Sequence, residues 1–123
     1  MPTLDDLTAA LRQFVADRDW QQFHDPKNLA MLIASEAGEL LAEYRWVRGE
    51  EADAHSREPQ ARARIAAEVA DVTIGLLLLC DRIGLDLERA VADKLAANAE
   101  RYPADASRGR AERPPAGVTP GSR

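Results

Sequence analysis

The chain has 123 residues and a formal net charge of −5, and only 5% of its residues are aromatic. This length fits one domain with a single hydrophobic core. The many Ala and Leu residues and the scarcity of β-branched runs favour an all-α fold. The negative charge argues against a general nucleic-acid binder, which is usually basic, but not against a nucleotide substrate held by a metal.

The cysteine content and the N-terminal residues indicate the cellular compartment of the protein. Cys80 is the only cysteine, so no disulfide forms within the chain, which suits a reducing cytoplasm. The first residues lack the basic and apolar regions of a signal peptide, and no apolar run approaches the roughly 20 residues that span a bilayer. We therefore expect a cytoplasmic protein that has no membrane or nucleic-acid polymer as its partner.

Helix start and stop signals delimit the first half of the chain. Thr3 opens a sequence that resembles a capping box before apolar residues at helical spacing, which predicts a first helix over residues 4–17. Asp25, followed by proline, predicts the start of a second helix over residues 26–48. Gly49 is expected to end this helix because glycine tolerates a positive φ.

The segment between these helices, residues 18–28, breaks the helical pattern and carries Trp20, Phe23 and His24. Two interpretations stay open. The aromatic side chains form a lid over the helix ends, which the sequence alone favours, or they form one wall of a pocket for a flat ligand.

The second half predicts two further helices. Residues 49–60 read as an acidic, turn-rich connection, in which His55 lacks the companions of a metal site. A third helix over residues 60–83, apolar almost all round in its middle, is expected to be the central core helix. A fourth is expected over residues 87–102, and residues 104–123 have too few large apolar side chains to fold and are predicted to be a disordered tail.

Four acids fall on helix faces that are otherwise apolar. Glu36 and Glu39 share one face of the second helix, and Glu68 and Asp71 share one face of the third, since residues three apart nearly align. Burying unpaired carboxylates is costly unless a cation neutralises them. We therefore predict a Mg²⁺ site between the two helices, with Mn²⁺ as a possible substitute.

Such a site is typical of phosphoryl or nucleotidyl transfer, in which a metal polarises the phosphate and stabilises the leaving pyrophosphate. On the fourth helix, Lys94, Asn98 and Arg101 lie along one face and are expected to bind an anion such as a phosphate chain. A di-iron site is the nearest rival, but neither histidine follows a glutamate by three residues. The other alternative is a non-enzymatic helical interaction protein whose acids make interchain salt bridges.

The acids and their spacing resemble the signature of the all-α nucleotide pyrophosphohydrolase superfamily, of the MazG and dimeric dUTPase type. That signature is Glu-x-x-Glu, a gap and Glu-x-x-Asp. Three further stretches are similar to the MazG-like dCTP pyrophosphatases, and the resemblance covers roughly residues 4–103. These stretches are Arg18-Asp-Trp-x-x-Phe-His-x-Pro-Lys-Asn28, Tyr44-Arg-Trp46 and Lys94-x-x-x-Asn98-x-x-Arg-Tyr-Pro103.

The resemblance implies a four-helix, MazG-like domain over residues 1–103 that hydrolyses a nucleoside triphosphate to the monophosphate and pyrophosphate with magnesium. It implies dCTP or a modified nucleotide as substrate, and a homodimer or homotetramer whose pockets are completed across subunits. The implied metal ligands and catalytic residues are Glu36, Glu39, Glu68 and Asp71. The implied substrate-binding residues are Trp20, His24, Trp46, Lys94, Asn98, Arg101 and Tyr102.

Two positions depart from relatives that are specific for dCTP. Gly75 stands where they often carry a tyrosine, and Leu11 stands where some carry a histidine that reaches the base. These differences leave the base preference open and predict a larger pocket.

Overall fold

The computed structural model describes residues 1–112, in which every regular element is helical. The predicted all-α fold is therefore confirmed, and all four long helices are present. The α-helices are α1 (Leu4–Asp17), α2 (Pro26–Ala42), α3 (Ala52–Arg57), α4 (Pro59–Ile83), α5 (Leu87–Arg101) and α6 (Ala104–Ser107), and the short 3₁₀ helices are η1 (Gln21–Phe23) and η2 (Gly49–Glu51).

The predicted helix ends are set by local hydrogen bonds. The Thr3 hydroxyl accepts from the Asp6 amide at 3.1 Å and completes a capping box at the start of α1. The carboxylates of Asp25 and Asp86 accept from backbone amides at the starts of α2 and α5. Gly84 ends α4 with φ +68, a left-handed conformation that favours glycine.

The prediction that the second helix extends to Arg48 is wrong, since α2 ends at Ala42. The amides of Glu43 and Tyr44 bond back three residues, which tightens the chain into a turn. This turn is tied to α3, because the Tyr44 hydroxyl lies 2.7 Å from Ser56 Oγ. The supposed connection over residues 49–60 accordingly contains η2 and α3. Local periodicity carried no signal for these tertiary bonds.

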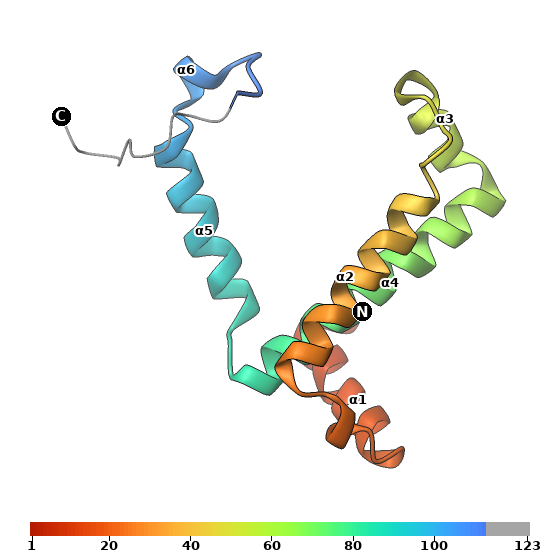
Figure 1. Cartoon of the computed structure of the whole chain (residues 1–123). Helices are drawn as coiled ribbons and strands as arrows, with labels where there is room; N and C mark the ends of the chain where they lie inside the picture. The colour runs from red at the N-terminus through yellow and green to blue at the C-terminus, as the bar shows by residue number, and fades with distance from the viewer. Residues whose placement is uncertain (113–123) are drawn as a thin grey trace. The chain divides into compact units, whose positions relative to one another are not determined.

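The first compact unit, residues 1–85, is organised around α4. Helices α1, α2 and α3 all contact α4, and α2 lies side by side with it along most of its length (Figure 1). The two helices run antiparallel, since Ile33 of α2 meets Gly75 of α4 and Glu36 of α2 meets the earlier residue Asp71. This pairing places the acids of the second and third predicted helices at one shared interface.

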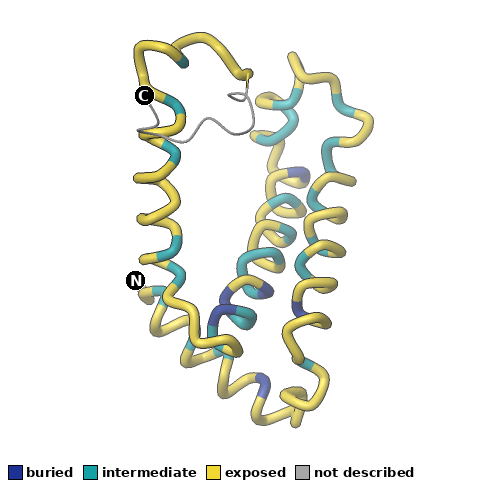
Figure 2. Tube along the Cα trace, turned by 60° about the vertical axis from the view of Figure 1, so that its left-hand side comes forward, coloured by how far each residue is buried: buried dark blue, intermediate teal, exposed yellow. Residues whose placement is uncertain are grey.

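Few side chains of the described chain are buried (Figure 2). Val15, Leu29, Leu77 and Cys80 form the buried core with Ala61. The predicted core faces are only partly covered. The apolar residues Phe14, Val69, Leu76, Ile83, Val91 and Leu95 are all exposed.

The second compact unit begins at Asp86 and contains α5 and α6. The short helix α6 lies within the segment predicted to be a disordered tail, and residues 113–123 of that segment lie outside the described residues. The prediction of a disordered tail therefore stays a prediction. In residues 1–112, no helix is both long enough and apolar enough to cross a membrane.

Candidate functional site

Three of the four predicted acids meet between α2 and α4. Glu36, Glu68 and Asp71 each offer a carboxylate oxygen, and these oxygens lie within 4.8 Å of one another. Glu36 and Glu68 are half-buried, whereas Asp71 is exposed. We call these three residues the acid cluster. Glu39, the fourth predicted ligand, is exposed and lies outside this group.

Glu68 is the most constrained member of the acid cluster. Its Oε2 is inaccessible to solvent and has no hydrogen-bond partner among the described residues. The pKa of Glu68 is raised, chiefly because burial disfavours the charged form and next because the protonated carboxyl hydrogen-bonds Glu36. The negative charges of Glu36, Asp71 and Glu39 raise this pKa further.

The donor set fits a hard divalent cation. Mg²⁺ prefers carboxylate oxygens and keeps other coordination positions for water and phosphate. A cation bound by Glu36, Glu68 and Asp71 would satisfy the orphaned Glu68 oxygen and offset the repulsion among three acids. The acid cluster is therefore suited to a divalent metal on its own geometry.

The expected space beside Gly75 is absent within this chain. A Cβ at Gly75 would meet Ile33 Cγ1 at 2.8 Å, so Ile33 of α2 fills the space that a side chain at this position would need. The prediction that Gly75 enlarges a pocket is wrong for this reason. Gly38 has the opposite environment, because a Cβ added there would meet no neighbouring atom within 4 Å. Close packing between the two helices therefore requires a glycine at position 75 on α4 and not at position 38 on α2.

The aromatic residues expected near the nucleoside lie on two separate turns. Trp20 follows α1 and packs edge-on against Phe14, with ring centroids 5.7 Å apart. Arg18 covers the Phe14 ring at 3.6 Å from its centroid. Trp46, in the turn after α2, is 89% exposed. The two tryptophans therefore sit at opposite ends of α2.

His24 is half-buried and lines a pocket of about 370 Å³ enclosed by α1, η1, α2 and α4. Its apolar lining includes Val15, Leu29 and Leu78, and none of the four predicted acids lines it. The acid cluster is therefore not part of the pocket that His24 lines. The polar residues of this pocket are Arg12, Gln13, Gln21, His24, Asp81 and Arg82.

The expected phosphate-binding residues belong to the second unit. Lys94 and Asn98 line a shallow groove of about 350 Å³ along α5, and Arg101 lies 5.8 Å from the ring centroid of Tyr102. The Tyr102 amide donates to the Asn98 carbonyl at 2.8 Å and ends the helix. Within its own unit α5 therefore presents Lys94 and Asn98 on one face, as the spacing predicted.

Sequence patterns missed a group of contacts beside the acid cluster. Glu43 pairs with Arg64 at 3.2 Å, and His55 Nε2 lies 3.1 Å from the Glu43 carbonyl oxygen. The rings of Tyr44 and His55 also meet edge to face, with centroids 5.8 Å apart. A signal was present, since Glu43 continues the spacing of Glu36 and Glu39 in the helix predicted over residues 26–48, and Arg64 precedes Glu68 by one turn.

The fold and this site define an all-α protein with a carboxylate cluster between two antiparallel helices. The chain belongs to the MazG-like family, which it matches over residues 31–113. It is 36% identical to a pyrophosphatase of known structure from Archaeoglobus fulgidus, with a TM-score of 0.75 over 84% of this chain and 94% of that one.

Mammalian proteins named dCTP pyrophosphatase 1 are also similar. The rat protein is 41% identical and the human protein 39% identical, each over 90 residues and 73% of this chain. That alignment covers 53% of each mammalian protein, so the chain spans about half the length of the curated relatives it matches.

Proposed function

We propose that this chain hydrolyses nucleoside triphosphates to the monophosphate and pyrophosphate, acting on dCTP or a modified nucleotide. The observation that carries the proposal is the acid cluster, in which three carboxylates converge within 4.8 Å around the orphaned Glu68 oxygen. The match to the MazG-like family and the names of the relatives support this reaction. Removal of unwanted nucleotides from the cellular pool is the role that fits it.

The residues of the acid cluster would hold Mg²⁺, or Mn²⁺ in its place. When bound, the metal supplies a Lewis acid that polarises the phosphate and stabilises the leaving pyrophosphate. Glu36, Glu68 and Asp71 fix its position from two helices. Glu39, exposed one turn along α2 from the cluster, is free to complete the ligand set or to orient the attacking water.

Binding of the nucleotide is assigned to the remaining predicted residues. Trp20, Trp46 and His24 present flat rings for a base, and Lys94 and Asn98, with Arg101 and Tyr102, present polar groups for the phosphate chain. The free, buried thiol of Cys80 is compatible with the reducing cytoplasm, where the nucleotide pool lies.

We further propose that the active form is a homodimer or homotetramer. Val69, Leu76 and Ile83 on α4 are exposed, as are Met31 and Leu41 on α2, so one long helix pair leaves large apolar side chains uncovered. A second copy of the chain would bury them. Light scattering coupled to size-exclusion chromatography tests this, and a monomer at micromolar concentration contradicts it.

The activity is tested with a panel of nucleotides in the presence of Mg²⁺. Added inorganic pyrophosphatase converts released pyrophosphate to phosphate, which malachite green detects. We expect magnesium-dependent release with dCTP or a cytosine analogue among the best substrates. A folded protein that releases pyrophosphate from none of them overturns the proposal and favours the non-enzymatic interaction protein.

A further inference from the structure

An ion pair crosses the α2–α4 interface next to the acid cluster. Arg64 Nε on α4 lies 3.2 Å from Glu43 Oε2, just beyond the end of α2. The Glu43 side chain is only 20% exposed, whereas that of Arg64 is 54% exposed. Glu43 is held a second time through its backbone, because His55 Nε2 lies within hydrogen-bond distance of its carbonyl oxygen.

Contacts along the interface run in strict antiparallel order. Ile33 faces Gly75, Glu36 meets Glu68 and Asp71, and Glu43 meets Arg64. Residue numbers therefore rise along α2 as they fall along α4. The acid cluster is bracketed by a close apolar contact on one side and by the ion pair on the other.

The ion pair is also placed to act on the acids. Arg64 precedes Glu68 by four residues, about 6 Å of rise along α4, and Glu43 lies at the end of α2, seven residues after Glu36. A slip or rotation of α2 against α4 would move Glu36 away from Glu68 and Asp71. Fixing the register at this end therefore fixes the spacing of the three carboxylates.

We propose that Glu43 and Arg64 are positioning residues that set the register of α2 and α4 and thereby hold the acid cluster in its cation-binding geometry. The inference rests on the proposed function in one respect, namely that the cluster binds a divalent cation. Arg64 also neutralises Glu43, so this fifth nearby acid does not add to the negative charge of the site. Neither residue bonds a member of the acid cluster directly, so the expected effect is smaller than the roughly 10–100-fold loss that follows removal of a group bonded to a metal ligand.

The competing role for Arg64 is direct contact with a substrate phosphate. Its Nε donates to Glu43, which ties the guanidinium to the end of α2, while the terminal N–H groups are the ones that a phosphate would take. The two roles differ in a measurable way, because a positioning residue changes cation binding without nucleotide and a phosphate ligand does not.

The test measures Mn²⁺ binding to the full chain by electron paramagnetic resonance, without nucleotide. We expect Glu43→Gln and Arg64→Gln to weaken Mn²⁺ binding by up to about fivefold, because a partly exposed ion pair contributes only modestly to holding the two helices. Arg64→Lys, which keeps a cation for Glu43, should bind close to wild type. Circular dichroism shows which variants are folded. If Glu43→Gln does not fold, the difference in Mn²⁺ affinity between Arg64→Lys and Arg64→Gln still tests the inference.

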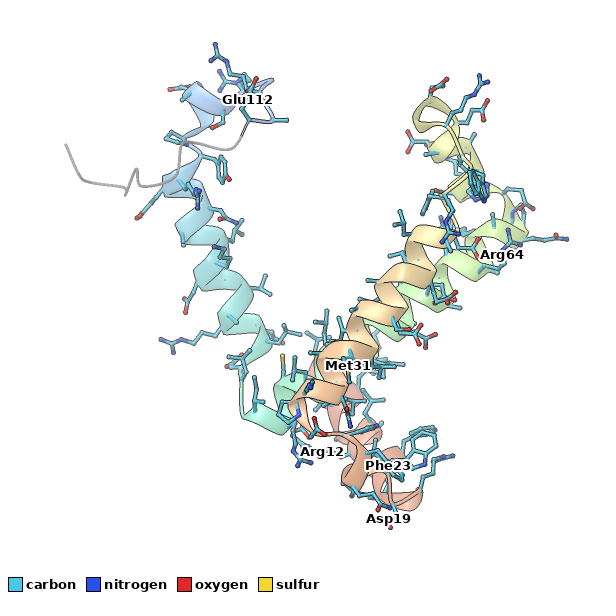
Figure 3. All side chains as sticks on the ribbon, in the orientation of Figure 1. Arg12, Asp19, Phe23, Met31, Arg64 and Glu112 are labelled. Carbon is cyan, nitrogen blue, oxygen red and sulfur yellow. The ribbon has the colours of Figure 1, made fainter. Side chains whose placement is uncertain are left out.

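Arg12→Gln is the matched control. Arg12 also bonds an acid of α4, with its Nε 2.8 Å from Asp81 Oδ1, but Asp81 lies ten residues beyond Asp71, about 15 Å along the helix. Figure 3 labels Arg12 and Arg64 near opposite ends of this helix. Arg12→Gln should lower Tm and leave Mn²⁺ affinity unchanged.

Two results would overturn the inference. One is a folded Arg64→Gln variant that binds Mn²⁺ as tightly as the wild type does. The other is an Arg12→Gln variant that loses as much Mn²⁺ affinity as Arg64→Gln. Unchanged Mn²⁺ affinity with a raised KM for the nucleotide would assign Arg64 to the phosphate instead. Failure of the wild-type chain itself to bind Mn²⁺ would refute the cation site of the proposed function, which is a distinguishable outcome.

Discussion

Gly75 of α4 packs directly against Ile33 of α2, so closely that a Cβ at Gly75 would stand 2.8 Å from Ile33 Cγ1. The contact also brings the Ile33 Cα within 3.8 Å of that position. Asp71 lies one turn before Gly75 and Glu36 lies three residues after Ile33. The glycine thus lets the helix backbones approach where the carboxylates of the two helices must meet.

Gly75→Ala is expected to destabilise the protein. Overpacking of a tight contact costs about 1–3 kcal/mol, whereas alanine in place of glycine in a helix regains up to about 1 kcal/mol. The expected net loss is up to about 2 kcal/mol in the free energy of unfolding, measured by urea denaturation. Gly38→Ala is the control, because the open surroundings of Gly38 leave only the gain in helix propensity.

The clash with Ile33 is tested by removing Ile33 Cγ1. In an Ile33→Ala background the same Gly75→Ala change should become neutral or stabilising, since the obstructing atom is gone. If Gly75→Ala costs as much in that background as in the wild type, Ile33 is not the cause.

The two glycines illustrate how far the sequence could be read. Periodicity placed Gly75 correctly on the acid-bearing stripe of its helix, but it could not show that a side chain from α2 fills the space opposite. The capping residues Thr3, Asp25 and Asp86 were predictable because their bonds reach only three residues along the chain.

The rest depended on contacts between distant parts of the chain. The end of α2 was misplaced because Tyr44 bonds Ser56, twelve residues away. The helix over residues 60–83 was expected to be the central core helix, but its apolar residues Val69 and Ile83 are exposed in the single chain. Periodicity shows that a helix face is apolar and does not show which surface covers it. Three acids of the site were predictable together, since their i,i+3 spacing is local on each helix.

Glu68 should make the stability of the metal-free protein depend on pH. Its pKa in the folded state is raised above the ordinary value of 4.5, so the folded state binds the proton more tightly than the unfolded state does. The contribution of Glu68 to stability is therefore greatest below pH 4.5 and is lost as the pH rises through the folded-state pKa. Thermal unfolding in EDTA, from about pH 4 upward, measures this loss.

Glu68→Gln isolates the effect of this residue from those of other acids. The pKa values of Glu58 and Asp6 are lowered by hydrogen bonds, so these two residues make stability rise with pH. They do so equally in the wild type and in Glu68→Gln. The difference in Tm between Glu68→Gln and wild type should grow as the pH rises, with the variant more stable at neutral pH. Parallel curves would show that Glu68 titrates normally.

Asp71→Asn is expected to lower turnover at least about a hundredfold, because it removes one of the three converging carboxylates proposed to hold the metal. Glu39→Gln is expected to have a similar effect on turnover. Its effect on Mn²⁺ affinity should be smaller than that of Asp71→Asn, because Glu39 lies outside the acid cluster. Circular dichroism should be unchanged in both variants, and retained turnover in both would remove these acids from catalysis.

The bond between Tyr44 and Ser56 yields a last prediction, which concerns the turn that carries Trp46. The Ser56 hydroxyl donates to the Ala52 carbonyl at 2.8 Å, so the Tyr44 hydroxyl is the donor in its 2.7 Å bond to Ser56 Oγ. Tyr44→Phe removes a donor and leaves Ser56 bonded to Ala52, which should cost about 0.5–1.5 kcal/mol.

Ser56→Ala should cost more, about 1–3 kcal/mol, because it leaves the half-buried Tyr44 hydroxyl without its acceptor. In the Tyr44→Phe background the cost of Ser56→Ala should fall, since no hydroxyl is then left unpaired. A double-mutant cycle in urea measures this coupling, and acrylamide quenching of Trp46 in a Trp20→Phe protein reports on the turn itself. Additive costs with unchanged quenching would show that the bond does not hold the turn.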